Sequence, residues 1–156
     1  MSTRTSKRAS ALLLKKDALL KPKLIGYWVA TAAFALEMLI AATGELFLSS
    51  PDHEIVQIRI HEGYPAYLLT ILGVWKLLGI IALLVPGFPR LKEWAYAGFF
   101  FDLTGAAVSG IVSGGAGDPG TTILFPIILT VIALASWALR PSSRTLGVLF
   151  PRRQLA

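Results

Sequence analysis

The sequence predicts an all-α integral membrane protein, folded as an up-down-up-down four-helix bundle with both termini in the cytoplasm. Two observations carry this prediction. Of the 156 residues, 54% are apolar and only 15% are charged, at a mean hydropathy of +0.65, and so short a chain cannot bury that much apolar surface in a core of its own. In addition, four stretches are long and apolar enough to cross a bilayer.

The four predicted spans form one transmembrane domain over residues 24–139. The spans cover residues 24–48, 66–85, 94–112 and 121–139. At a rise of about 1.5 Å per residue they measure about 28 to 38 Å, which matches a hydrocarbon core about 30 Å thick. Because the connections are short, consecutive helices are expected to be antiparallel neighbours. Pro126 lies a few residues inside the last span, where it either occupies the first helical turn or kinks the helix.

Basic residues gather on one side of the predicted spans. They fill the N-terminal segment 1–23, the second connection around Arg90 and Lys92, and the tail 140–156. The first connection, 49–65, is mainly acidic, and the third, 113–120, holds no basic residue. Since short loops rich in Lys and Arg stay in the cytoplasm, both termini are predicted to lie there.

The net charge of +6 is mostly a signal of this topology. It does not argue for a nucleic-acid partner, which requires a basic face on a soluble module. Within the N-terminal segment, residues 11–23 mix leucines with Lys15, Lys16 and Lys21. That mixture fits a short interfacial helix on anionic lipid, and a frayed basic tail fits it equally well.

Several kinds of redox and metal chemistry are excluded by composition. The chain has no cysteine, so it forms no disulfide and no thiolate-ligated iron or zinc site. Its two histidines, His53 and His61, both lie in the first connection, which leaves a haem between the helices without ligands. Beside Glu54 and Glu62 they would make a weak surface metal site, but a solvated loop is the favoured interpretation, and no metal is predicted.

Three ionisable residues, Glu37, Lys76 and Asp102, fall near the middle of the first three spans. A charge at the centre of a membrane helix costs from about 3 to more than 10 kcal/mol, so such residues normally face a packed interior and find partners. We therefore expect the three to converge inside the bundle, either as a functional site or as a device that fixes helix register. Glu45, about two turns beyond Glu37, either extends this polar track toward water or is an interfacial charge.

Small residues at helical spacing predict which faces of the spans pack together, because they let helix backbones approach. Glu37 and Asp102 share such faces, and Trp75, beside Lys76, either lines a cavity or faces lipid. The predicted packing residues are Ala33, Gly44, Gly73, Gly79, Gly98, Gly105 and Ser109.

Several runs of sequence carry a family resemblance. The runs are Gly63-Tyr64-Pro65, GVWKLLG at 73–79, VPGFPRLKEWAYAG at 85–98 and FDLTGA at 101–106. In this order and spacing the chain resembles the DoxX-like family of small bacterial integral membrane proteins, over roughly residues 26–138. The resemblance implies a multi-pass protein of the bacterial cytoplasmic (inner) membrane. It also implies a link to redox systems, because some members of that family are the small subunit of a thiosulfate:quinone oxidoreductase or join membrane oxidoreductase complexes.

The family's signature positions are matched here by Trp75, Lys76, Asp102, Thr104 and Gly105. They coincide with the charges identified above from their cost in the membrane. One departure concerns the residues after the Thr-Gly-Ala run, where many relatives have a Ser-His pair and this chain has Ser109 followed by Gly110. A role for that histidine therefore does not carry over.

The leading hypothesis is a membrane subunit of a redox system that binds a lipophilic ligand such as a quinone. Lys76 and Asp102 would polarise or protonate its oxygens and Glu37 would exchange the proton, with Trp75 and Thr104 as further candidates. The chain has no redox centre of its own, so electrons would come from a redox partner protein. The alternative is a non-enzymatic scaffold or lipid-binding protein whose charges specify helix packing, alone or as a homo-oligomer. A proton-coupled transporter is less favoured, because no inverted repeat is detectable.

Overall fold

The computed structural model describes residues 2–47, 63–114, 118–141 and 144–145. Within these ranges the protein is helical, and four of its helices are long and apolar enough to cross a membrane, as predicted. The elements are α1 (Ser2–Phe47), α3 (Ala66–Leu84), α4 (Pro89–Val112), a π-helix η1 (Gly120–Leu124) and α5 (Phe125–Leu139). The predicted surface pair His53 and His61, with Glu54 and Glu62, lies outside the described residues.

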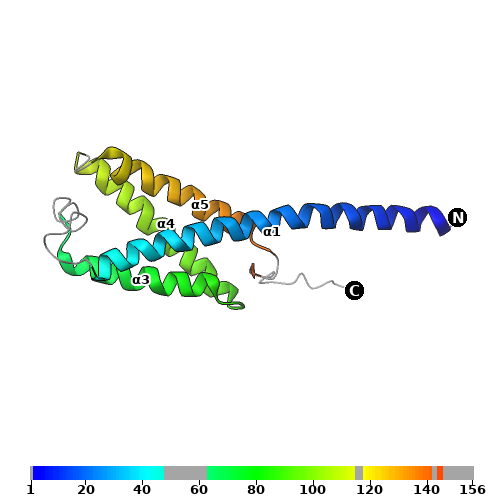
Figure 1. Ribbon diagram of the computed structural model, residues 1–156, viewed down its shortest axis with the longest axis horizontal. Coiled ribbons are helices and arrows are strands. Elements are labelled where there is room, and N and C mark those ends of the chain that lie inside the picture. Colours follow the sequence, from blue (N-terminus) through cyan, green and yellow to red (C-terminus); the bar gives the residue numbers. More distant parts are fainter. Residues whose placement is uncertain (1, 48–62, 115–117, 142–143, 146–156) are drawn as a thin grey trace, which may run out of the picture.

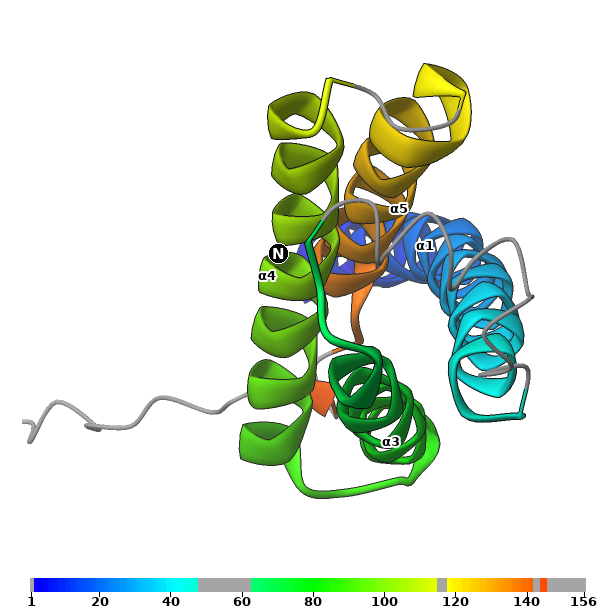
Figure 2. The same cartoon turned by 90° about the vertical axis from the view of Figure 1, so that its left-hand side faces the viewer.

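The four long helices form a ring in which each contacts two neighbours. Helix α1 packs against α3 and α5, and α4 packs against the same two helices from the other side (Figure 2). Helix α1 extends far beyond the other helices at its N-terminal end (Figure 1). It begins at Ser2 and contains Pro22, so the predicted first span and the N-terminal segment form one continuous helix. Whether that extension lies on lipid stays a prediction.

An apolar core lies between the four helices. Phe34 and Met38 of α1 meet Leu83 of α3, Phe99 of α4 and Leu129 of α5, and all are at most 4% exposed. The rings of Phe34 and Phe99 contact edge to face, with centroids 5.0 Å apart, so they join two helices across the diagonal of the ring. Leu78, Val108 and Val131, by contrast, point outward and are half or more exposed. Apolar surface inside and outside is typical of a membrane helix bundle.

The turn between α3 and α4 explains why α4 begins five residues before the predicted span. Gly87 (φ 80°) and Phe88 (φ 49°) adopt left-handed backbone conformations, and Pro89 then starts α4 with its φ already set for a helix. The polar residues that follow were expected to lie in a loop. Instead, the fully buried Lys92 folds back over the end of α3 and donates hydrogen bonds to the carbonyls of Ala82 (2.8 Å), Leu83 (2.9 Å) and Val85.

The last span begins with a π-helical turn because of Pro126. Proline has no amide hydrogen, so the carbonyl of Thr122 loses the partner that an α-helix would give it, and the wider turn of η1 precedes α5. Pro126 is therefore in the first turn of α5. A Cβ added at Gly110 of α4 would lie 2.7 Å from the Thr122 carbonyl oxygen, so α4 and η1 touch backbone to backbone there.

Alanine substitution of two glycines in α4 should have opposite effects. Gly110→Ala is expected to lower the free energy of unfolding by about 1 to 3 kcal/mol, because its methyl group would force two backbones apart. Gly98→Ala meets nothing within 4 Å and should be neutral or stabilising by up to about 1 kcal/mol through helix propensity. Unfolding of the two purified variants in mixed micelles measures both changes, and equal effects would contradict the close contact at Gly110.

Candidate functional site

Lys76, near the middle of α3, is the centre of a buried charge cluster. Its Nζ atom forms an ion pair with Glu45 of α1 and lies 3.5 Å from Oδ2 of Asp102 on α4. Lys76 is 8% exposed and Glu45 is 7% exposed, so the cluster is withdrawn from the surroundings. We call Glu45, Lys76 and Asp102 the charge cluster; it ties three helices together at one level.

The predicted meeting of Lys76 and Asp102 is found, but Glu37 does not join them. Glu37 is half-buried on α1 and forms no ion pair within the described part of the chain. The prediction assumed that the middles of the spans lie at equal depth. Instead, Gly73, one turn before Lys76, abuts Ala42 and Leu46, so the turn that carries Glu45 reaches the level of Lys76. Glu45, the less favoured of the two α1 carboxylates, occupies the place predicted for Glu37.

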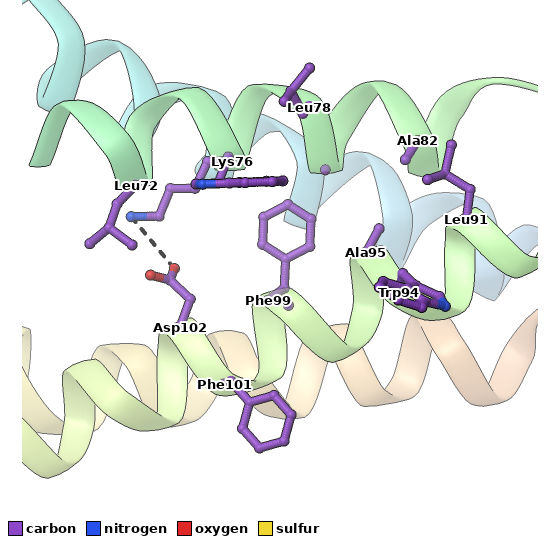
Figure 3. Close-up of a pocket in the computed structure, with 13 residues that line it drawn as sticks. Leu72, Lys76, Leu78, Ala82, Leu91, Trp94, Ala95, Phe99, Phe101 and Asp102 are labelled. Carbon is purple, nitrogen blue, oxygen red and sulfur yellow. Dashed lines mark ion pairs between the residues drawn. The ribbon is translucent and has the colours of Figure 1, made fainter. Parts of the chain in front are cut away.

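A cavity of about 610 Å³ lies between α3 and α4, and we call it the α3–α4 cavity. Figure 3 shows Lys76 and Asp102 pointing toward one another across this gap, and Phe99 reaching from α4 toward α3. These two charged residues are the ionisable ones among its lining; the rest are apolar, aromatic or glycine. The cavity opens to the side of the bundle, because its rim residues Trp75 and Trp94 are 67% and 79% exposed.

A second cavity, of about 410 Å³, lies between all the helices, and we call it the central cavity. Its lining is more polar than that of the α3–α4 cavity. It includes the charge cluster, the Tyr64 side chain before α3, and the threonines at positions 121 and 122 of η1. Lys76 and Asp102 line both cavities, so the ion pair stands where they meet.

The remaining candidates from the sequence divide between the two possible roles. Trp75 was expected either to line a cavity or to face lipid. It lines the α3–α4 cavity and is also largely exposed on the side of the bundle, so it fits both descriptions. Thr104 is half-buried, and its hydroxyl donates a 2.6 Å hydrogen bond to the carbonyl of Phe100 on its own helix. Within the described chain, Thr104 therefore supports α4 rather than reaching into the cluster.

The predicted packing residues also separate into two groups. A Cβ at Gly73 would lie 2.8 Å from Leu46 and one at Gly79 would lie 2.6 Å from the Phe99 ring, so these two glycines sit at helix contacts; Gly44 is buried as well. Ser109 is half-buried and its hydroxyl is hydrogen-bonded to that of Tyr64. The other three, Ala33, Gly98 and Gly105, are exposed, and a Cβ built at either of these two glycines meets nothing within 4 Å.

A polar network at the opposite end of the bundle was not identified from the sequence. Ser136 of α5 shares 2.7 Å hydrogen bonds with both Thr31 of α1 and Tyr96 of α4. One turn further on, at the C-terminal end of α5, Arg140 forms a 2.7 Å ion pair with Glu93. Hydroxyl residues are common on membrane helices and are therefore a weak signal. The sequence hinted at this network only through the positions of Thr31 and Ser136 on the inward faces of their two helices. Lys92 carries a clearer signal, since a basic residue one turn after a Pro-Gly-Phe-Pro turn is placed to reach the preceding helix end.

These features define a multi-pass helical membrane protein with an ion-paired interior and a cavity open to the side. A family model described as the DoxX-like family matches residues 29–136. The chain therefore belongs to the DoxX-like family. No curated protein and no solved structure matches it. Gly110, which stands where the resemblance would place the histidine of a Ser-His pair, has no room for a side chain against η1.

Proposed function

We propose that this protein is the membrane subunit of a redox system and holds a lipophilic, oxygen-bearing ligand such as a quinone in the α3–α4 cavity. One observation carries the proposal. A cavity of ligand size, about 610 Å³, has apolar and aromatic walls, a side opening, and a single ion pair at one end. Ligand sites of this kind are mostly apolar, with a few polar groups that fix the orientation of the ligand.

The chemistry of the lining suits such a ligand. The ammonium group of Lys76 donates hydrogen bonds, and Asp102 donates one when it is protonated; both are placed to hold a carbonyl or hydroxyl oxygen. The apolar walls formed by Leu72, Leu78 and Phe99 fit a hydrocarbon tail or ring. A quinone takes up electrons and protons together. The chain has no cysteine, and its two histidines lie outside the predicted spans, so the bundle lacks ligands for an iron centre and the electrons would come from a partner protein.

The same proposal includes an orientation in the bilayer. The end with Lys92, Arg140 and Arg144 faces the cytoplasm of a bacterial inner membrane, because basic residues concentrate there. The two termini share that side in an up-down-up-down bundle.

Photolabelling with an azido-benzoquinone that carries a short isoprenoid tail tests the proposed ligand. In nanodiscs, the label is expected on peptides of α3 and α4 that line the cavity. Gly98→Phe fills the cavity without a backbone clash, since nothing lies within 4 Å of a Cβ at that position. It should reduce labelling at least tenfold, as read by peptide mass spectrometry.

The matched control is Val108→Phe. Val108 lies on the same helix, is 58% exposed and lines neither cavity, so labelling should be unchanged. Labelling that is spread evenly over the four helices, or that survives Gly98→Phe, would contradict a quinone site between α3 and α4.

A scaffold role is the second candidate, and the charge cluster favours it directly. Lys76 joins residues of α1 and α4 to α3 by ion pairs, and buried polar groups can fix the register of a bundle. On this proposal, substitutions in the cluster reduce the amount of folded protein, and filling the α3–α4 cavity has no effect on any partner's activity.

A further inference from the structure

The two cavities approach the charge cluster from different directions. Leu72, Lys76, Phe101 and Asp102 line both of them. On one side of the ion pair lies the apolar α3–α4 cavity, which opens to the side of the bundle. On the other side lies the central cavity, where Glu45 and Tyr64 are the further titratable residues. The carboxyl group of Asp102 therefore borders an apolar space and a polar one.

The central cavity leads to one end of the bundle. Its lining includes Tyr64, which precedes α3, and Thr121 of η1, which is exposed. In the opposite direction Phe34, Leu83 and Phe99, none of which lines the central cavity, belong to the buried apolar core. The polar lining thus continues from the charge cluster toward the end where α3 and η1 begin.

We propose that the central cavity holds water and is the path by which Asp102 exchanges its proton with the solution at that end. Each water needs about 30 Å³ and two to four polar partners; a cavity of about 410 Å³ with Glu45, Lys76, Asp102 and the Thr122 residue of η1 provides both. The proton passes between a carboxyl oxygen of Asp102 and a cavity water, and no other bond changes.

This path separates the supply of protons from the supply of ligand. The proposed lipophilic ligand enters from the bilayer through the α3–α4 cavity, whereas protons arrive through the central cavity, and both meet at Asp102. With the orientation proposed above, the protons exchange with the outer compartment. The role of the proton rests on the proposed function, but the access of water to the central cavity does not.

Two matched cysteine variants test the water access. The chain has no cysteine, so a single introduced thiol is the only one that reacts. Gly98 and Gly105 lie seven residues apart on the same helix, and nothing lies within 4 Å of a Cβ built at either position. Gly98 lines the α3–α4 cavity and Gly105 lines the central cavity. The full chain is placed in nanodiscs and treated with a charged methanethiosulfonate or with lipophilic N-ethylmaleimide.

Gly105→Cys is expected to react with the charged reagent at least tenfold faster than Gly98→Cys, while both react with the maleimide. Val108→Cys is the depth control, because Val108 is nearer the end of α4 but lines neither cavity; it should resist the charged reagent. Equal rates for Gly98→Cys and Gly105→Cys would overturn the proposal. Ala106→Cys, which also lines the central cavity, repeats the test if Gly105→Cys fails to fold.

The proton itself is tested with a water-soluble carbodiimide. A protonated carboxyl group passes its proton to a carbodiimide nitrogen and adds through oxygen to the central carbon, and the resulting O-acylisourea rearranges to a stable N-acylurea. In the chain without substitutions, Asp102 should be labelled by the carbodiimide, as read by peptide mass spectrometry. Gly105→Trp, which blocks the central cavity, should reduce this modification at least tenfold, and Gly98→Trp, which blocks the α3–α4 cavity, should leave it unchanged. The reverse pattern would overturn the proposed path, even if quinone photolabelling of the α3–α4 cavity succeeds.

Discussion

Lys76→Met is expected to lower the free energy of unfolding by about 3 to 5 kcal/mol, because it leaves buried carboxylates without their cation. Glu45 is 7% exposed and pairs with Lys76, and Asp102 lies 3.5 Å from the same ammonium nitrogen. Methionine keeps most of the side-chain volume and removes the charge, so the loss reports the ion pairs rather than a cavity. Unfolding in mixed micelles, followed by circular dichroism, measures the change.

The double variant Lys76→Met with Asp102→Leu is the informative control. Replacing a buried ion pair by apolar residues of similar volume is often nearly neutral, whereas removing one partner is not. The double variant removes the Lys76–Asp102 pair but leaves Glu45 without its cation, so it should recover part of the loss, about 1 to 3 kcal/mol relative to the sum of the two single variants. A Lys76→Met protein within about 1 kcal/mol of the original would contradict a stabilising role for these ion pairs.

This pair of variants also separates the two proposed functions. A double variant that folds well but no longer takes up the quinone photolabel supports a site in which Lys76 and Asp102 contact the ligand. A double variant that folds, keeps the label and keeps any partner's activity supports a cluster whose role is to fix the contacts of α1, α3 and α4.

The charge cluster could be predicted from the sequence in part, for a physical reason. The cost of burying a charge depends on residue type and on depth, and both are readable in a hydrophobic span, so Lys76 and Asp102 were identified. The choice between Glu37 and Glu45 depends on how far α1 runs past α3. That offset is set by contacts such as Gly73 with Leu46, which no hydropathy pattern contains.

The same limit explains the packing glycines. Small residues at Gly73, Gly79, Gly98 and Gly105 carry the same signal in the sequence, yet the first two meet neighbouring helices and the last two face open space. A small residue permits a close contact, and it also permits a cavity. Only the positions of the neighbouring helices decide between the two, so the α3–α4 cavity was not predictable from the stripe of glycines that borders it.

Lys92→Met is expected to cost about 3 kcal/mol or more, although a hydropathy plot treats Lys92 as one more cytoplasmic charge. Its buried ammonium group donates hydrogen bonds to the carbonyls of Ala82, Leu83 and Val85. The last carbonyls of a helix have no partner within the helix, and each buried acceptor that loses its donor costs about 1 to 3 kcal/mol. The positive charge also interacts favourably with the helix dipole of α3. Unfolding in mixed micelles gives the change directly.

Arg90→Met is the matched control for this prediction. Arg90 lies two residues before Lys92 in the same turn of α4, carries the same charge and is exposed, so its loss should change the free energy of unfolding by no more than about 0.5 kcal/mol. If the basic residues of this turn act only by their charge at the membrane surface, the two variants will lose the same stability. A large loss confined to Lys92→Met would instead show that this lysine completes α3 and holds the start of α4 against it, which fixes the end of the α3–α4 cavity farther from Asp102.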